Sequence, residues 1–365
     1  MRPEPRPELA QMPEAIHGAL DFAELERLGV APEAVLDFSV NGNPYGPSPL
    51  VREALARIPY ERYPDRDALA LRRLLATQLQ VPLEQLLVGN GSMELLWLVA
   101  LSFLRPGDAV LLLGPTFGEY QRVAMLMGAR LHQCTAQAAE HFRIIPERVQ
   151  QALETLQPRL VFLCNPNNPT GTFMPPEQIA SWARAFPGTL FVVDEAYLTF
   201  VQQAPSVLTV LQPNMLLLRS MTKAYALAGL RLGYAIASAE ILSALRQASP
   251  PWSVNALAQA AGIAALQDTA HLEACLTRIT EAYADLVAGL RQCGGCPLPS
   301  TTHYCLLPVA QASLCRQALL RYGLQVRDCT SFGLPTYIRI ATRRPSENAR
   351  LLAALEELRP WPGFC

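Results

Sequence analysis

The sequence lacks the charge excess and the long apolar runs that mark several classes of protein. Its 30 lysines and arginines nearly balance its 31 aspartates and glutamates, which leaves a formal net charge of −1. So small an excess gives no electrostatic reason to expect nucleic acid or an anionic membrane as a partner. No apolar stretch reaches the length of a membrane span without charges, and none follows a basic start. We therefore expect no membrane segment, no signal peptide and a cytoplasmic location.

The chain also lacks a pattern of cysteines that would indicate a disulfide framework or a metal site. Its nine cysteines are scattered along 365 residues, and their number is odd. Cys293 and Cys296 have C-x-x-C spacing, but Pro297 follows them and no second pair or nearby histidine accompanies them. Zinc needs further ligands, and a redox pair needs a following helix. We therefore expect a loop here and no metal.

What the chain has in quantity is apolar sequence, since 50% of its residues are hydrophobic, enough for a sizeable core. Strand-like apolar runs recur, with amphipathic helical patterns between most of them. These runs cover residues 86–88, 109–113, 160–163, 190–193, 215–218 and 234–237. The alternation predicts an α/β fold with a mostly parallel, mixed sheet between helices. A helical stretch from about residue 254 to 292 leads into a smaller α+β part.

We predict three parts on this basis. The first 16 residues are rich in proline and glutamate and show no periodicity, which indicates a loose arm. The arm is predicted over residues 1–35, a large domain over 36–255 and a small C-terminal domain over 256–365.

One lysine stands out by its surroundings. Lys223 follows two hydroxyl residues, Ser220 and Thr222, and precedes small and apolar residues that run on to Arg231. A desolvated lysine has a lowered pKa, so its neutral amine can attack a carbonyl. Hydroxyls and a guanidinium are the donors that a phosphate prefers. An aldehyde-reactive lysine beside a phosphate cradle predicts a binding site for pyridoxal 5′-phosphate (PLP).

Other segments supply the remaining parts of such a site. Asp194 ends a buried strand and fits the acid that the PLP ring nitrogen needs, while Tyr197 can reach the ring hydroxyl. Asn168 lies in a turn-rich loop after another buried strand, where α/β sheets bind ligands, and can donate its amide to the ring oxygen. Phe117 is a candidate to stack on the pyridine face.

The phosphate also needs backbone donors. Gly91 and Ser92 lie in a glycine turn between a short apolar strand and a helix, which places free N–H groups at the positive end of a helix dipole. Taken singly, each of these segments also fits a plain structural role: a tight turn, a helix cap or a core aromatic. Their occurrence in one chain favours the cofactor site.

Together these marks resemble the fold-type I PLP enzymes of the class I/II aminotransferase family, over nearly the whole chain. The shared motifs are Asn43-Pro44-Tyr45-Gly46, Arg62-Tyr63-Pro64-Asp65, Gly89-Asn90-Gly91-Ser92, Asn165 through Gly171, Asp194-Glu195-Ala196-Tyr197, Lys223, Gly229 through Tyr234 and Tyr337-Ile338-Arg339. Within the family the chain is similar to two sister groups, the threonine-phosphate decarboxylases of cobalamin synthesis and the histidinol-phosphate aminotransferases of histidine synthesis.

Local motifs divide between these two groups. His17-Gly18, Asp37-Phe38-Ser39 and the stretch from Trp252 to Asn255 are closer to the decarboxylases, although Ala19 stands where that group has a second glycine. The segment from Asn43 to Pro49 favours the aminotransferases. We therefore expect a threonine-phosphate decarboxylase-like lyase. The alternative is a histidinol-phosphate aminotransferase-like transferase that uses glutamate and 2-oxoglutarate.

The resemblance also implies roles that the residues alone do not. It implies a homodimer in which Tyr63 reaches the cofactor phosphate of the partner subunit. It implies that the substrate is a small phosphorylated amino acid or amine. Arg339 is expected to grip a substrate carboxylate bidentately. His17, Asn43 and Arg327 are expected to orient a substrate phosphate.

Overall fold

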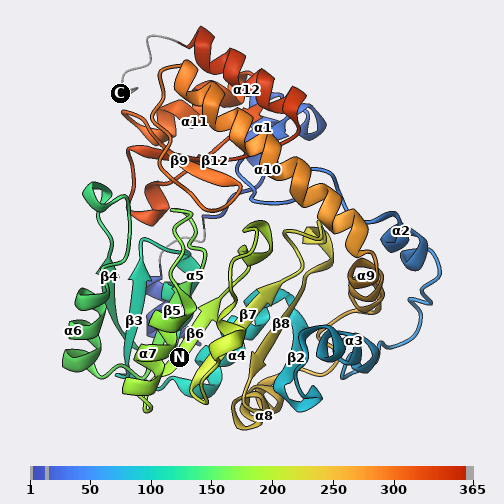
Figure 1. The fold of residues 1–365 in the computed structure, drawn as a ribbon, viewed down its shortest axis with the longest axis vertical. Coiled ribbons are helices and arrows are strands. Elements are labelled where there is room, and N and C mark those ends of the chain that lie inside the picture. Colours follow the sequence, from blue (N-terminus) through green and yellow to red (C-terminus); the bar gives the residue numbers. More distant parts are fainter. Residues whose placement is uncertain (1–2, 13–15, 359–365) are drawn as a thin grey trace.

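The computed structural model describes residues 3–12 and 16–358 of the chain. In Figure 1 a large sheet with helices on both faces forms the lower part, and a small sheet with its own helices forms the upper part. Parts of the predicted N-terminal arm and the last residues of the predicted small domain lie outside the described ranges.

The helices alternate with strands through most of the chain, as the apolar pattern predicts. They are α1 (Phe22–Leu28), α2 (Pro49–Leu55), α3 (Leu69–Leu79), α4 (Gly91–Phe103), α5 (Gly118–Leu126), α6 (Pro146–Leu156), α7 (Pro176–Ala185), α8 (Ala239–Ala248), α9 (Ala256–Gln267), α10 (Thr269–Gln292), α11 (Ala312–Arg321) and α12 (Pro345–Glu357).

The strands form one large and two small sheets. They are β1 (Leu36–Asp37), β2 (Leu86–Asn90), β3 (Ala109–Gly114), β4 (Arg130–Thr135), β5 (Leu160–Cys164), β6 (Leu190–Asp194), β7 (Met215–Ser220), β8 (Leu232–Ala237), β9 (Tyr304–Pro308), β10 (Leu324–Gln325), β11 (Arg327–Asp328) and β12 (Tyr337–Ala341). The seven strands of the large sheet run in the order β2-β8-β7-β6-β5-β3-β4.

The large sheet is mixed but mostly parallel, which confirms the predicted fold class. Only β8 runs against its two neighbours, β7 and β2. The edge strand β4, residues Arg130–Thr135, was not predicted. Its residues are all exposed or half-buried and include arginine, histidine, glutamine and threonine, so it has no apolar run. An edge strand is covered less than a central one, and its sequence carries a weaker signal.

The core of the large sheet lies on both of its faces, because successive residues of a strand point to opposite sides. Val161 and Leu163 of β5 pack in the cluster that includes α3, α6, α7 and α9, whereas Phe162 packs in the cluster that includes α4, α5 and α8. Each cluster holds a large buried aromatic, Trp182 on α7 and Tyr120 on α5. The strands between them are therefore held rigidly, with their carboxyl ends fixed relative to one another.

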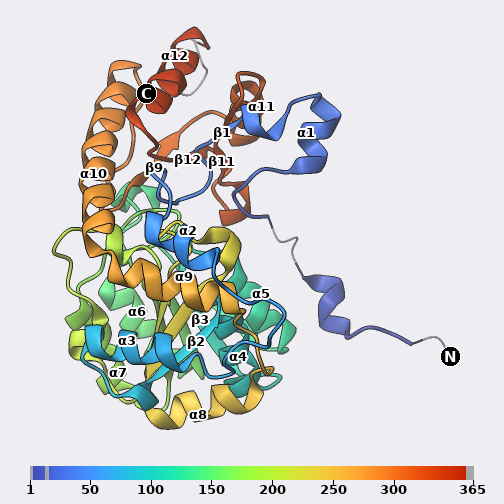
Figure 2. The same cartoon turned by 90° about the vertical axis from the view of Figure 1, so that its right-hand side faces the viewer.

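The small sheet has the order β11-β12-β9 and packs on α10, α11 and α12 through its own apolar cluster. Helix α10 spans both parts, since Ile279 packs in the core of the large sheet and Leu286 in that of the small sheet. It runs diagonally between the two parts in Figure 1. Figure 2 shows α1 beside α11 in the upper part, where Leu25 packs with Leu320.

The three-part division of the chain stays a prediction. Ala258 and Ala261 of α9 pack in the core of the large sheet. We therefore propose that the large domain runs through α9 and that the small domain begins within α10.

Candidate active site

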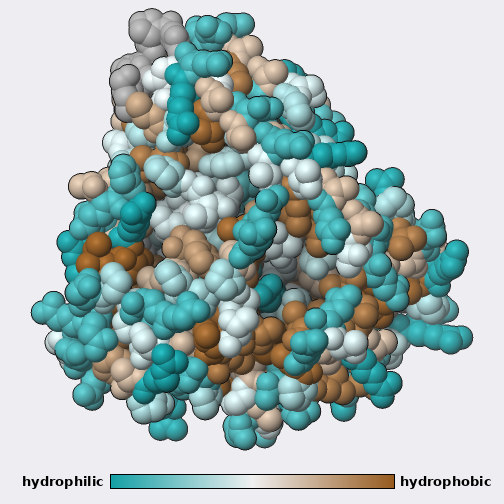
Figure 3. All heavy atoms as spheres, in the orientation of Figure 1, coloured by the Kyte–Doolittle hydropathy of each residue, from teal (hydrophilic) through white to brown (hydrophobic). Residues whose placement is uncertain are grey.

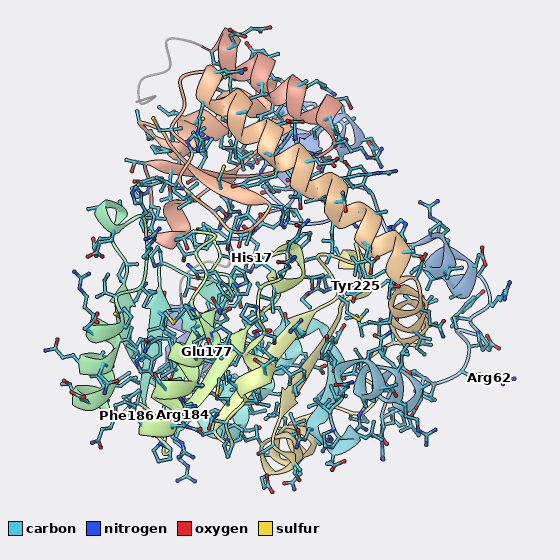
Figure 4. All side chains as sticks on the ribbon, viewed as in Figure 1. His17, Arg62, Glu177, Arg184, Phe186 and Tyr225 are labelled. Carbon is cyan, nitrogen blue, oxygen red and sulfur yellow. The ribbon has the colours of Figure 1, made fainter. Side chains whose placement is uncertain are left out.

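A cavity of about 460 Å³ opens where the large sheet, the small sheet and the N-terminal segment meet. Cys164, Asp194 and Ser220, the last residues of β5, β6 and β7, lie in its wall. The carboxyl edge of an open α/β sheet is where such folds bind ligands. In Figure 4 His17 lies between the lower and the upper part. The sequence-predicted residues that line this cavity are His17, Ser92, Phe117, Asn168, Asp194, Tyr197, Ser220, Thr222, Lys223, Arg231, Arg327 and Arg339.

Lys223 lies just after β7 and lines the cavity. Burial lowers the pKa of its amine to about 8, and the nearby charges of Arg339 and Arg231 add to this effect, while Asp194 opposes it. A larger fraction of the enzyme than for an ordinary lysine therefore has a neutral Lys223 amine near physiological pH. A lysine must be neutral to attack an aldehyde.

Asp194 ends β6 with its carboxylate buried. Tyr120 Oη donates to one carboxylate oxygen at 2.9 Å, and the backbone N–H of Ala196 donates to the other at 2.9 Å. Burial nevertheless raises the pKa of Asp194 above its ordinary value. The ionised carboxylate is thus in need of a positive partner, and a protonated ring nitrogen is one.

Tyr197 and Asn168 lie beside Arg339 in the same wall. Arg339 Nη1 donates to Asn168 Oδ1, and its Nη2 donates to Ser39 O at 2.5 Å. Burial raises the pKa of Tyr197 to about 12, so its phenol keeps its proton and can act as a donor. The Tyr197 ring also packs edge-on against Tyr304, with the centroids 5.2 Å apart.

An anion cradle lies at the start of α4. Ser220 Oγ and Thr222 Oγ1 are 2.7 Å apart, and both line the cavity with Ser92 and Arg231. Gly91 begins α4 with φ +76°, and a Cβ at this position would lie 3.0 Å from Arg231 Nη2. The glycine therefore leaves room for the guanidinium. Hydroxyls, a guanidinium and the unpaired N–H groups of a helix start together suit a phosphate.

These residues fit PLP. The lysine, the buried acid and the anion cradle provide the three kinds of group that the cofactor needs, and Phe117 lines the same cavity at the start of α5. Its ring packs edge-on against Tyr120, 5.6 Å between centroids. The individual contacts between these residues and PLP stay predictions.

Arg327 and Arg339 form a second cationic group in the cavity. They are opposite one another in the antiparallel register of β11 and β12, and both are buried. Burial first, and then the charge of Arg339, lowers the pKa of Arg327 to about 10. Within residues 3–12 and 16–358, neither guanidinium forms an ion pair with a carboxylate. Two buried like charges in this position are stabilised by an anionic ligand.

Three predicted residues do not line the cavity: Asn43, Tyr63, and Gly91, which directly precedes Ser92 at the start of α4. Asn43 lies outside the lining of the cavity. Its backbone N–H donates to Lys223 O at 3.1 Å, and its Nδ2 donates to Ala224 O at 3.0 Å. It therefore holds the lysine segment in place. Tyr63 is 81% exposed and packs on Trp252, with the ring centroids 4.8 Å apart. The neighbouring Arg62 lies at the outer edge of the molecule in Figure 4, far from His17.

Sequence reasoning missed two cavity residues, Glu119 and Tyr120, on the first turn of α5. Tyr120 hydrogen-bonds to Asp194, and Glu119 pairs with His17. A signal was present, because they lie two and three residues after Phe117, near the carboxyl end of a predicted strand, the edge where ligands bind.

Residues 33–355 match the family model described as aminotransferase class I and II. The chain belongs to the class I and II aminotransferases. It is a PLP-dependent enzyme of this family, which confirms the cofactor predicted from Lys223 and its neighbours. The described residues contain no helix long and apolar enough to cross a membrane, and no group of side chains able to hold a metal ion.

Individual relatives carry more specific names. The chain is 39% identical over 324 residues to a histidinol-phosphate aminotransferase of Symbiobacterium thermophilum, covering 87% of this chain and 88% of that protein. Its fold resembles the histidinol-phosphate aminotransferase of Sinorhizobium meliloti in complex with pyridoxal-5′-phosphate, with a TM-score of 0.85, 25% identity and 96% of each chain covered. The L-threonine-O-3-phosphate decarboxylase of Porphyromonas gingivalis is also similar, with a TM-score of 0.75, 27% identity and coverage of 88% and 98%.

Proposed function

We propose that this enzyme is a histidinol-phosphate aminotransferase that transfers an amino group between histidinol phosphate and 2-oxoglutarate. This was the alternative in the sequence analysis, where short motifs favoured the decarboxylases. The relatives named histidinol-phosphate aminotransferase, up to 39% identical along most of the chain, now support it better. Similarity over most of the chain outweighs similarity in three short segments.

The observation that carries the proposal is the pair of Arg327 and Arg339 in the cavity wall. Both guanidiniums are buried, and neither has a carboxylate partner in the described part of the chain. A phosphate on one substrate and a carboxylate on the other both suit such a pair, because guanidiniums bind either group in a bidentate manner. An aminotransferase that accepts histidinol phosphate and 2-oxoglutarate in turn needs one site for both anions.

We propose the following division of work among the cavity residues. PLP, when bound, supplies the electron sink that stabilises negative charge at the substrate α-carbon. Lys223 holds the cofactor and, with a pKa of about 8, can take and return a proton near neutral pH. Asp194 keeps the ring nitrogen protonated. The groups proposed to position the cofactor are Gly91, Ser92, Phe117, Asn168, Tyr197, Ser220, Thr222 and Arg231.

Orientation of the substrate decides the reaction, since only the α-carbon bond perpendicular to the ring is weakened. Arg339 is tied to Asn168, which we propose lies at the cofactor's ring oxygen. A substrate anion on Arg339 is therefore held at a fixed angle to the ring. In histidinol phosphate the phosphate takes this role, so the C–H bond and not a carboxylate can face the ring.

We propose that the active form is a homodimer. Large aromatic side chains are exposed around Tyr63: Tyr60, on the same segment, is 85% exposed, and Trp252, which packs on Tyr63, is 46% exposed. Figure 3 also shows brown, apolar residues over the lower half of the face in this view. Exposed apolar surface of this kind marks protein contacts. By resemblance, Tyr63 reaches the cofactor phosphate of the partner subunit.

The test of the proposed function is a coupled assay of the purified enzyme with histidinol phosphate and 2-oxoglutarate. We expect glutamate to form in proportion to the histidinol phosphate consumed. Absence of glutamate with this pair of substrates, in a preparation that retains bound cofactor, would contradict the proposal.

A further inference from the structure

Glu119 is the feature of the cavity that cofactor binding and anion binding leave unexplained. Its carboxylate lies on the first turn of α5, is 4% exposed and lines the cavity. The other cavity carboxylate, Asp194, already accepts hydrogen bonds from Tyr120 and the backbone of Ala196. Glu119 thus places a second carboxylate in a wall whose cationic groups, Arg122, Lys223, Arg231, Arg327 and Arg339, suit anions. A buried carboxylate needs donors, and its partners indicate which kind it receives.

The partners of Glu119 include an imidazole that belongs to the chain itself. His17 Nε2 lies 2.9 Å from Glu119 Oε1, and Arg122 Nε lies 3.2 Å from the same oxygen. The His17 ring also lies beside the ring of Phe117, with the centroids 5.6 Å apart and tilted by 41°. A carboxylate and an aromatic ring therefore already hold an imidazole in the cavity wall.

Among the described residues, two hydrogen bonds hold the backbone on either side of His17. Arg327 Nη2 donates to Ile16 O at 2.8 Å, and Ala19 N–H donates to Ser39 Oγ at 2.9 Å. Ala19 has φ +111°, a conformation that costs a residue with a Cβ and that glycine adopts freely. The His17 side chain is 45% exposed, whereas that of Glu119 is 5% exposed. Displacement of the half-exposed histidine would therefore uncover little of the core, whereas the carboxylate belongs to the buried wall.

A phosphorylated imidazole compound would replace two contacts of the N-terminal segment, the one from Arg327 to Ile16 O and the one from His17 to Glu119. Its phosphate would compete with Ile16 O for Arg327, and its ring would compete with His17 for Glu119. Both exchanges release the same N-terminal segment. One ligand with a phosphate and an imidazole would therefore replace both contacts together.

We propose that Glu119 and Phe117 form a subsite for the imidazole ring of the substrate, and that His17 fills this subsite as an internal stand-in that the substrate displaces. The inference rests on the proposed function, because histidinol phosphate carries the required ring. It also reverses the expectation for His17: the residue competes with the substrate and does not bind its phosphate.

The test is a titration of the holoenzyme with three probes, in which calorimetry measures the affinity for each probe. They are histidinol phosphate, histidinol, which has the ring without the phosphate, and 2-aminoethyl phosphate, which has the phosphate without the ring. Glu119→Gln should weaken histidinol phosphate and histidinol by about 10- to 100-fold, the range for a hydrogen bond to a charged group. It should leave 2-aminoethyl phosphate within about twofold. His17→Ala should tighten both ring-bearing probes, because the competitor is gone.

The matched control is Glu177→Gln, since Glu177 is also an acidic residue in the first turn of a helix, α7, and is labelled apart from His17 in Figure 4. It should change none of the three affinities. Equal loss of all probes in Glu119→Gln, or weaker ring binding in His17→Ala, would overturn the subsite. If Glu119→Gln does not fold, His17→Ala still tests the subsite.

The two proposals fail in different ways. Wild-type enzyme that forms glutamate from histidinol phosphate while Glu119→Gln binds it unchanged would overturn the subsite alone. Enzyme that binds histidinol phosphate through Glu119 but does not transfer its amino group to 2-oxoglutarate would support the subsite and contradict the proposed function.

Discussion

Replacement of Arg327 by glutamine tests whether the pair of Arg327 and Arg339 binds substrate anions. It leaves the proposed cofactor residues in place. Arg327 is buried, and its Nη2 donates to Ile16 O at 2.8 Å and to Ser331 Oγ at 2.6 Å. Arg339 is less suitable, because it donates to Asn168, which we propose lies at the cofactor's ring oxygen, so its loss would also disturb a proposed cofactor residue. Arg327→Gln therefore removes mainly the charge that we propose binds a substrate phosphate.

The magnitude follows from what the phosphate loses. A hydrogen bond to a charged group contributes about 1.5–3 kcal/mol. Since each 1.4 kcal/mol is a factor of ten, the loss corresponds to about 10- to 100-fold in kcat/KM. Stability should change little, because burial of Arg327 already lowers its pKa and so costs free energy in the folded state. Thermal melting of the variant checks that point.

The assay compares histidinol phosphate with histidinol, so that only the response to the phosphate is measured. The ratio of the two kcat/KM values should fall by the stated factor in Arg327→Gln. The ratio for Arg327→Lys should lie between those of the wild type and Arg327→Gln, because lysine keeps the charge but lacks the bidentate guanidinium. Arg184→Gln, at an exposed position on α7, is the matched control and should leave the ratio unchanged. An unchanged ratio in Arg327→Gln would refute the assignment.

Four further predictions follow from the site and the core. Borohydride should fix the cofactor to the peptide that contains Lys223, and apoprotein should capture PLP faster as the pH rises through about 8, where the amine loses its proton; a flat pH profile contradicts this. Asp194→Ala should lose most turnover yet keep bound cofactor, at a cost of several kcal/mol in the barrier, and near-normal turnover would exclude the role. Mixing inactive Lys223→Ala with weakened Tyr63→Phe chains should restore activity through hybrid dimers; an active monomer in sedimentation would exclude shared sites. Trp182→Ala should destabilise the fold by about 3–5 kcal/mol, because Trp182 is a fully buried core residue, as chemical denaturation would measure.

The parts of the site that could be predicted lie at the ends of central strands. β5 and β6 are buried along their whole length, so their apolar runs are clear in the sequence and mark where each strand stops. Because parallel strands end at one edge, Asn168, Asp194 and Lys223 were expected to converge there. The structure places all three in one cavity.

The parts that could not be predicted depend on contacts between distant segments. The register that sets Arg327 opposite Arg339 is a property of β11 and β12, and β11 has only two residues and no apolar pattern. The pairing of His17 with Glu119 joins an irregular N-terminal segment to a helix start. No periodicity encodes such contacts. The sequence analysis predicted one helical stretch from about residue 254 to 292. In the structure Asp268 separates α9 from α10, and α9 packs on the large sheet.

The most direct test of the account compares the two reactions in one enzyme preparation. Histidinol phosphate with 2-oxoglutarate is supplied in one vessel, and O-phospho-L-threonine labelled in its carboxyl group in another. The account predicts glutamate in the first vessel and no release of labelled CO₂ in the second. Labelled CO₂ from the second vessel, with no glutamate in the first, would contradict it.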